Sequence, residues 1–450
     1  MENTRLISLL KTLDKKEWRE LRKFIQSPFV NQREDVFRLF QTLGDYIKSE
    51  KSIPDKPILF KKIYGNEPFE DHKIRMIMSF LFRHIEQFLI YKSMFQDEIK
   101  VKTQLAEIYR KRNLPKHFER TIREAKDLIK KHPYRNANFY ENTYRIYLEE
   151  DEFTVQTRQM SELKNQEISD NHNITFIARK LRQSLASLTH QTVYKAQYRF
   201  GLLSEVLNFV EEEGLLEVPV IAVYYYCYKA LTQPQNETYF SKLKHLIFEK
   251  SELFPHEEAR DFYVLAINFC IKQYNAGNQK YLKDQFEFYK DGLKKNYFLT
   301  DGHLSRFAYQ NIVTLGLITE EFDWVNDFIH DYRENLKEPY RESVFSFNLA
   351  VLRYEQKDFN EALQLLQKSE YKDLLLSLAA KTLILKIYYE LDEIDALLSH
   401  LDAMRIFIRR KHDLGYHRDN YLNTIKYTKK LIEVNPFDKK AKSDLKSEIE

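Results

Sequence analysis

The sequence predicts an all-α protein, and two observations lead to that prediction. The chain has 450 residues but only 9 glycines and 11 prolines, whereas average proteins contain roughly 7% and 5% of these residues. Turn-dense all-β chains, collagen-like chains and disordered Pro/Gly-rich chains need far more of both. Amphipathic helical periodicity also covers most of the chain, with only short breaks. The nine glycines form no phosphate-binding loop of the kind found in nucleotide-binding α/β enzymes.

Residues 1–98 are expected to form a separate helical unit. A short helix, Leu6–Leu13, precedes Asp14, which is predicted to cap the next helix with Glu17 as its capping-box partner. That helix should end at Ser27, because the residue before a proline avoids helical geometry. Further helices are expected at 33–49, 57–64 and 71–94, with Asp71 as the cap of the last one.

A repeated outline is found in the second half of the chain. Its clearest copy has Asn348, Leu349, Ala350, Tyr354, Asp358, Phe359 and Ala362. Thirty-five residues later the outline recurs with Tyr388, Tyr389, Glu393, Ile394 and Leu397. Thirty-seven residues before Phe359 stands Phe322, with Asn311 and Ile312 in the places of Asn348 and Leu349. Small residues such as Ala350 and Ala362 let two helices approach closely, so stacked helix pairs are predicted.

This outline resembles the tetratricopeptide repeat, a pair of antiparallel helices of about 34 residues. The resemblance implies a tetratricopeptide-like, right-handed α-solenoid of antiparallel helix pairs, and it extends over residues 99–435 in degenerate form. The best copies are 305–340, 342–375 and 377–411, and residues 436–450 form a polar C-terminal tail. A basic N-terminal unit joined to degenerate repeats also resembles uncharacterised bacterial proteins of this kind, which implies no activity.

The copies depart from the family pattern at several places. Lys357 stands where the family usually has a glycine before the second helix. Residues 170–260 match poorly, and the sequence leaves open whether they are degenerate repeats or an insertion. In relatives that grip a peptide's terminal carboxylate, polar residues stand where this chain has Phe347 and Val351. The resemblance therefore implies an aromatic, mostly apolar groove instead of a carboxylate clamp.

In proteins of this family the first helices of the pairs line a concave groove. Carried over to this chain, the groove positions are Gln310, Thr314, Phe347, Val351, Tyr354, Glu355, Thr382, Lys386 and Tyr389. Extended or helical peptides bind to such surfaces. The alternative for Tyr354 and Tyr389 is packing between neighbouring helices.

The predicted function is that of a non-catalytic scaffold that binds a protein or peptide in this groove. No catalytic motif, metal-ligand spacing or cofactor-binding loop is present in the sequence, so no enzyme activity, metal or cofactor is expected. An enzyme built on a helical-repeat scaffold remains a further alternative. The N-terminal unit is a candidate for homodimerisation or for holding a second partner.

An alternative function is suggested by an uneven charge. Residues 1–140 contain 30 Lys and Arg against 19 Asp and Glu, a net charge of +11, whereas residues 141–450 contain 41 against 48, a net charge of −7. A basic stripe predicted to contact phosphates consists of Lys116, Arg120, Arg123 and Lys130. The chain would then be a nucleic-acid-associated regulator. A solvated helix face explains the same residues, and acidic neighbours that interrupt the stripe would favour that explanation.

Neither a membrane segment nor a leader is expected. The longest largely apolar run without charge is Phe307–Thr319, 13 residues, whereas a spanning helix needs about 20. The apolar stretch Leu6–Leu10 is too short for a signal peptide. Cys227 and Cys270 lie in apolar surroundings and are expected to be buried, reduced thiols. These features predict a cytoplasmic protein without membrane contact.

Overall fold

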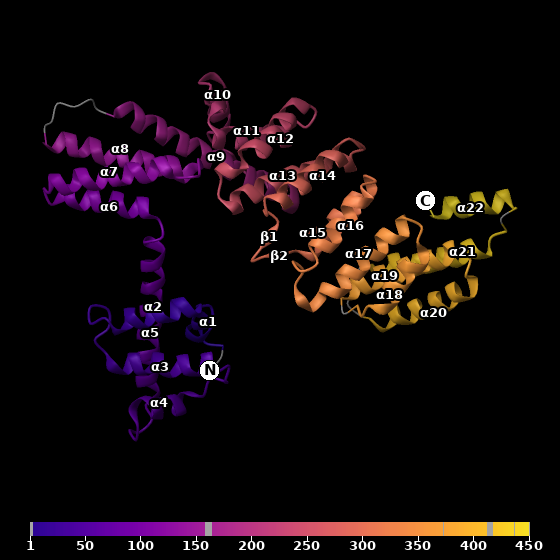
Figure 1. Ribbon diagram of the computed structural model, residues 1–450, viewed down its shortest axis with the longest axis horizontal. Coiled ribbons are helices and arrows are strands. Elements are labelled where there is room, and N and C mark those ends of the chain that lie inside the picture. Colours follow the sequence, from indigo (N-terminus) through magenta and orange to yellow (C-terminus); the bar gives the residue numbers. More distant parts are fainter. Residues whose placement is uncertain (1–2, 158–163, 372, 412–416, 436, 450) are drawn as a thin grey trace. The chain divides into compact units, whose positions relative to one another are not determined.

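The computed structural model describes residues 3–157, 164–371, 373–411, 417–435 and 437–449. Regular structure in these ranges is almost entirely α-helical (Figure 1), which confirms the predicted fold class. The strands are a short antiparallel pair, β1 (Leu299–Thr300) and β2 (His303–Leu304). Within the described ranges, no helix has both the length and the apolar character that crossing a membrane requires. The chain divides into two compact units, Met1–Ile177 and Ala178–Glu450.

The first five helices of the first unit lie close to their predicted positions. In chain order they are α1 (Arg5–Lys11), α2 (Lys15–Gln26), α3 (Glu34–Lys48), α4 (Lys56–Tyr64), α5 (Asp71–Met94), α6 (Glu98–Lys111), α7 (Pro115–Lys131) and α8 (Ala137–Thr157). Helix α9 (Asn165–Tyr194) crosses the division between the units.

The start of α2 shows the predicted capping box. The Asp14 carboxylate accepts hydrogen bonds from the backbone N–H groups of Lys16 (2.6 Å) and Glu17 (2.7 Å), and the Glu17 carboxylate accepts one from the Asp14 N–H (3.0 Å). The Lys92 ammonium of α5 donates to the other Glu17 oxygen at 2.9 Å. These bonds satisfy N–H groups that a helix start leaves unpaired, and they tie α2 to α5.

One predicted cap is wrong. Asp71 is the first helical residue of α5, and Glu70 occupies the N-cap position without a side-chain bond. The Asp71 carboxylate instead accepts from the Lys56 ammonium at 2.9 Å and pairs with Arg75 at 2.7 Å. Two cations therefore hold the side chain that was expected to bond to the helix backbone.

The first unit contains two separate apolar cores. One is built from α1–α5 and the segment that joins α3 to α4, between Leu6 and Phe88. The other is built from α6, α7 and α8, between Ile99 and Phe153, where the Phe118 and Phe153 rings stack with centroids 4.1 Å apart. The division by contacts falls after residue 177 instead of residue 98. The domain boundary near residue 98 stays a prediction.

The second unit consists mainly of helices joined by short turns. They are α10 (Leu203–Glu212), η1 (Leu215–Glu217), α11 (Pro219–Thr232), α12 (Glu237–Lys250), η2 (Ser251–Leu253), α13 (His256–Asn275), α14 (Tyr281–Lys294), α15 (Arg306–Ile318), α16 (Phe322–Asp331), η3 (Glu338–Tyr340), α17 (Arg341–Glu355), α18 (Phe359–Lys368), α19 (Leu374–Glu390), α20 (Ile394–Arg410), α21 (His417–Glu433) and α22 (Lys439–Ile449).

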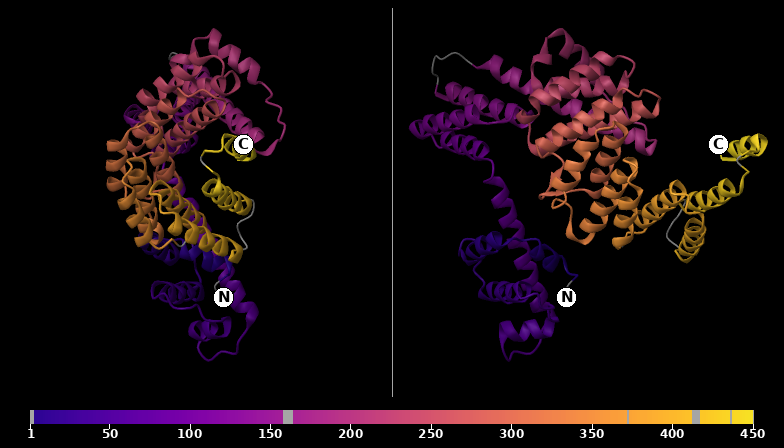
Figure 2. Two further views of the ribbon diagram at one scale, coloured as in Figure 1. Left: turned by 90° about the vertical axis from the view of Figure 1, so that its right-hand side faces the viewer. Right: turned by 45° about the vertical axis from the view of Figure 1, so that its right-hand side comes forward.

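Helices α11–α20 form five consecutive pairs. Each odd-numbered helix packs against the even-numbered helix that follows it, from α11 with α12 to α19 with α20. Each even-numbered helix up to α18 also packs against the next odd-numbered one, and α15, α17 and α19 pack in succession. Figure 2 shows these pairs, coloured pink to orange, stacked one after another. Helices α11 and α12 therefore lie in the same series of helix pairs, and the repeat character of residues 170–260 stays an open prediction.

The three best repeat copies share one turn between their two helices. Glu320, Lys357 and Asp392 all have left-handed backbone conformations, with φ of 62°, 64° and 58°. The next residue in each copy donates its N–H to the carbonyl five residues earlier, always at 2.9 Å. This is the Schellman arrangement that ends a helix. Lys357 therefore takes the conformation for which the family uses glycine, and the repeat keeps its turn without one.

Gly316 of α15 leaves no room for a larger side chain between α15 and α16 in the first of these copies. A Cβ atom at this position would lie 2.4 Å from Val325 Cγ2 on α16 and 3.2 Å from the Phe286 ring on α14. We expect Gly316→Ala to lower the free energy of unfolding by about 1–3 kcal/mol, despite alanine's helix-propensity advantage of about 1 kcal/mol. Hydrogen exchange of the α15 and α16 amides measures this loss. Adding Val325→Ala to Gly316→Ala should restore part of the protection against exchange. If Gly316→Ala alone is as well protected as the wild type, the packing argument is wrong.

Candidate functional site

A cavity of about 260 Å³ opens on the odd-numbered helices of the second unit. Residues of α15, α17, α19 and α21, together with Asp373 just before α19, line it. In the repeat copies these are the first helices of the pairs, apart from α21, which follows the last pair. The cavity therefore lies on the same helices that the resemblance assigns to the groove.

The rim and the floor of the cavity are mostly apolar. Phe307 and Leu375 stand at its edge with 63% and 44% of their surfaces exposed. Val344 and Leu376 are buried behind them, and the Tyr421 ring of α21 adds an aromatic wall. Burial raises the pKa of the Tyr421 hydroxyl above its ordinary value. An apolar side chain that enters the cavity would therefore cover two large exposed hydrophobic groups.

One ion pair forms the polar edge of the cavity. The Arg306 guanidinium donates to Asp373 Oδ2 at 2.9 Å, and the other Asp373 oxygen accepts from the Leu376 N–H at the start of α19. The Arg306 guanidinium also lies over the Phe307 and Tyr340 rings, 4.8 and 5.5 Å from their centroids. The cation and the carboxylate largely neutralise each other, so this edge offers hydrogen-bonding groups without a strong net charge.

The predicted groove residues occupy different environments in the first copy and the next. Gln310 lines the cavity, and Thr314 is exposed one turn further along α15. On α17, Phe347 is buried, Val351 is half-buried and Glu355 is exposed. Phe347 lies in the core because α17 has neighbours on both sides, α15 with α16 and α18 with α19.

The remaining groove positions are also mixed. The Tyr354 ring lies 5.5 Å from Phe359 of the same pair, and burial followed by nearby carboxylates raises the pKa of its hydroxyl. The Thr382 hydroxyl donates to the Leu378 carbonyl inside α19. Lys386 and Tyr389 are exposed on the same helix. Tyr354 therefore has a packing contact of the kind given as its alternative, whereas Lys386 and Tyr389 are accessible.

Sequence reasoning missed most of the cavity. Arg306 lies one turn before Gln310 on α15, so its spacing could have suggested it. Asp373, His417 and Tyr421 lie 67 or more residues further along the chain. No local pattern links such distant positions to α15, because their proximity is created by the stacking of the repeats.

The predicted phosphate-contacting residues lie on α7 in a mixed-charge surface. Lys116, Arg123 and Lys130 are exposed. Arg120 donates to Glu124 at 2.9 Å, and the Lys102 ammonium donates to the same carboxylate at 2.6 Å, which lowers the pKa of Glu124. Glu119 is exposed three residues after Lys116, on the same side of the helix. Carboxylates therefore interrupt the stripe, and this arrangement is typical of a solvated helix face.

The two cysteines are free and buried, as expected. Burial raises the pKa of the Cys227 thiol to about 12 and that of Cys270 in the same direction. A raised pKa keeps both groups protonated and unreactive at neutral pH. Over the described ranges, no three His, Cys, Asp or Glu side chains are grouped so as to hold a metal ion.

No protein-family model matches the chain, and no curated protein matches it. Among solved structures it is similar to one described as "Crystal structure of APC/C hetero-tetramer Cut9-Hcn1", with 13% identity over 99% of this chain and 89% of that chain and a TM-score of 0.25. A score of that size carries no argument about the arrangement of the helices. The packing of α11–α20 and the turn shared by the last three pairs show a stack of consecutive helix pairs, as the repeat pattern predicts.

Proposed function

We propose that the protein is a non-catalytic scaffold that binds a segment of a partner protein on the odd-numbered helices of its second unit. The observation that supports this most directly is the cavity beside Phe307 and Leu375. Large exposed apolar side chains around a pocket are typical of binding sites. An apolar anchor of the partner would enter the cavity, and the segment would continue along α17 and α19 past Lys386 and Tyr389.

The expected energetics are those of an interface dominated by a few anchors. Burying one large apolar side chain contributes about 1.5–3 kcal/mol, and truncating a central anchor residue costs about 2 kcal/mol or more, roughly a 30-fold loss of affinity. The paired charges of Arg306 and Asp373 would orient the segment through hydrogen bonds. Specificity would come from these bonds, and affinity from the apolar contact.

The test compares variants in affinity purification from the cells that make the protein, with high-salt washes and nuclease treatment. A partner that survives both treatments is then purified and its Kd measured. Phe307→Ser is expected to weaken binding about 30-fold, and Tyr389→Ala to weaken it less, because it lies beyond the cavity. Ile406→Ser is the matched control, since Ile406 is an exposed apolar residue on α20, away from the cavity.

Two results would contradict the proposal. One is an equal loss for Ile406→Ser, which would indicate general surface stickiness. The other is loss of the partner after nuclease treatment, which would favour the nucleic-acid alternative. We do not propose that alternative, because Glu119 and Glu124 interrupt the basic stripe on α7. A cytoplasmic location and homodimerisation through residues 1–98 stay predictions.

A further inference from the structure

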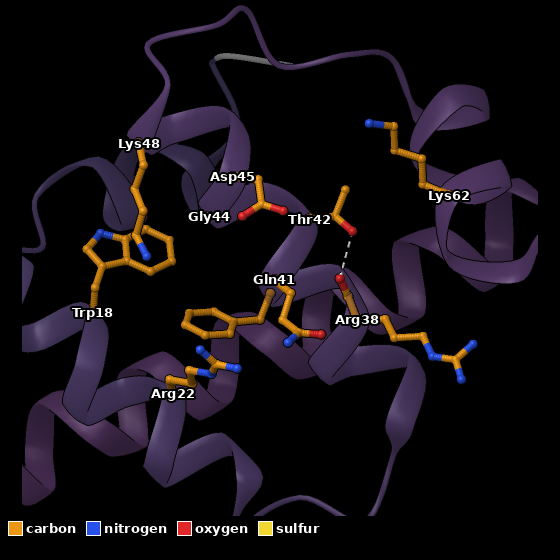
Figure 3. Close-up of a pocket in the computed structure, with 10 residues that line it drawn as sticks. Trp18, Arg22, Arg38, Gln41, Thr42, Gly44, Asp45, Lys48 and Lys62 are labelled. Carbon is orange, nitrogen blue, oxygen red and sulfur yellow. Dashed lines mark hydrogen bonds between the residues drawn. The ribbon is translucent and has the colours of Figure 1, made fainter.

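A second, larger pocket lies between α2, α3 and α4 of the first unit (Figure 3). Its volume is about 430 Å³, within the range of small-molecule sites. Seven of the ten lining residues lie on α3, and five of them, Arg38, Gln41, Thr42, Asp45 and Lys48, share one face because they follow each other at spacings of three, one, three and three residues. Helix α2 and helix α4 complete the ring of side chains.

The lining carries a strong excess of positive charge. Four cations, Arg22, Arg38, Lys48 and Lys62, stand against the single carboxylate of Asp45. All four are exposed side chains on three different helices. Their net charge of about +3 is concentrated in one concavity, where it creates a positive potential that attracts anions.

Most of these cations have no carboxylate partner of their own. Within the described ranges, no ion pair joins Arg22, Lys48 or Lys62 to an acidic side chain, and Arg38 has only an exposed pair with Glu34 at 3.3 Å. The Lys48 ammonium lies 5.6 Å from the centre of a Trp18 ring, and the Lys62 ammonium lies 4.5 Å from that of Tyr46. Aromatic faces therefore hold the two lysines, and their charges remain free for a ligand.

The aromatic rings at the floor of the pocket are buried and offer no open face to a ligand. Trp18 and Phe40 are 6% and 3% exposed, and their rings stack with centroids 5.1 Å apart. A Cβ atom on Gly44 would lie 3.1 Å from the indole, so this side is also filled. Single-stranded nucleic acids bind through exposed aromatic faces on which their bases stack. No such face is offered here, so the pocket is suited to recognise charge and not bases.

We propose that this pocket binds a small anion that carries two or more phosphate groups. Several phosphate oxygens could each meet a different cation of the ring, whereas one carboxylate would neutralise only part of the excess charge. The Thr42 hydroxyl donates to the Arg38 carbonyl at 2.8 Å, whereas the exposed Gln41 amide is a neutral side-chain donor in the lining. The Asp45 carboxylate repels a bound anion and therefore lowers the affinity of the pocket for it.

The test is isothermal titration of the full-length protein with inorganic pyrophosphate at low ionic strength. The same titration is done with inorganic phosphate and with ATP. Phosphate tests whether one phosphate group is enough for binding, and ATP tests whether a nucleoside adds to the affinity. Pyrophosphate and ATP should bind with similar affinity, and phosphate about tenfold more weakly. Salt should weaken all three.

Charge-matched variants distinguish the pocket from the general charge of the unit. Arg22→Gln and Lys62→Gln are expected to weaken pyrophosphate binding about tenfold each. Asp45→Asn is expected to strengthen it several-fold, because it removes the opposing charge. Arg19→Gln on α2 and Lys61→Gln on α4 are the controls, since they remove the same charge from exposed residues outside the lining. Both should stay within about twofold of wild type.

Three outcomes would overturn the proposal. The first is no binding of pyrophosphate at millimolar concentration. The second is an equal loss in the control variants, which would indicate nonspecific attraction. The third is a single-stranded oligonucleotide or an acidic peptide that binds more tightly than pyrophosphate and competes with it, which would identify a macromolecular ligand. Circular dichroism of each variant checks that it is folded, and Asp45→Asn remains informative even if a cation variant unfolds.

Discussion

Replacing Arg110 with methionine is expected to lower the stability of the α6–α8 bundle by about 3–5 kcal/mol. The Arg110 guanidinium of α6 donates to Glu149 of α8 at 2.9 Å and also pairs with Glu152. The side chains of Arg110 and Glu149 are each only 12% exposed. Methionine fills similar space but leaves the Glu149 carboxylate without its counter-charge. Hydrogen exchange of the α6 and α8 amides measures the loss in this bundle, even if the two units unfold separately.

The loss should depend on pH in a defined direction. Burial raises the pKa of Glu149 above its ordinary value of 4.5, although the bond from Arg110 acts the other way. When the pKa of a carboxyl is higher in the folded state than in the unfolded state, the stability of the fold decreases as the pH rises from the unfolded pKa through the folded one. Without Arg110 the pKa rises further. The loss of stability caused by Arg110→Met should therefore be largest at neutral pH and become smaller as the pH falls towards 4.5.

An exposed pair on the next helix provides the matched control. Arg120 donates to Glu124 at the same distance, 2.9 Å, but its side chain is 81% exposed. Arg120→Met is expected to cost less than about 0.5 kcal/mol. The double variant Arg110→Met, Glu149→Met should recover most of the loss, because no buried charge remains. Equal losses at Arg110 and Arg120, or a loss that does not change with pH, would contradict the argument.

Replacing Tyr224 with phenylalanine is expected to destabilise the contact between α11 and α13 by about 1.5–3 kcal/mol. The Tyr224 hydroxyl donates to Glu258 Oε1 at 2.6 Å, and both residues are buried. Burial, followed by the charge of Glu258, raises the pKa of the Tyr224 hydroxyl, so it stays a donor at all ordinary pH values. The variant keeps the ring but removes a hydrogen bond to a buried carboxylate. Exchange of the α11 and α13 amides measures the effect.

The neighbouring tyrosine gives a control with the same bond length. The Tyr225 hydroxyl donates to Glu211 at 2.6 Å, but the Glu211 side chain is 46% exposed and keeps a pair with Lys229. Water replaces the lost partner there, so Tyr225→Phe should cost about 0.5 kcal/mol. If the two variants lose the same protection, burial of the carboxylate is not what makes the Tyr224 bond important.

Local features of this chain could be predicted because they depend on residues close together in sequence. The capping box of Asp14 and Glu17 follows from a three-residue spacing, and the structure contains it. The helix end at Ser27 follows from the proline after it. The repeat copies were recognised from small and aromatic residues at fixed intervals, although the turn glycine is replaced by Lys357. The shared Schellman turn explains this, since it needs a conformation and not a particular residue.

Features that depend on how helices meet could not be predicted in the same way. The sequence predicts Asp71 as a cap, but Lys56 and Arg75 hold its carboxylate. The repeat position of Phe347 predicts a groove residue, but neighbours on both sides of α17 bury it. The basic stripe on α7 depended on charge spacing, and only the structure shows Lys102 of another helix sharing the Glu124 carboxylate with Arg120.

The helical class, the repeat spacing and the ends of several helices follow from the sequence, because these depend on backbone propensity and on side chains a few residues apart. The tertiary structure settles which surfaces are open. It brings Asp373 and Tyr421 to Phe307, and it collects Arg22, Lys48 and Lys62 around one pocket. Residues on separate helices become neighbours only when packing places the helices side by side, and no spacing along the chain encodes that distance.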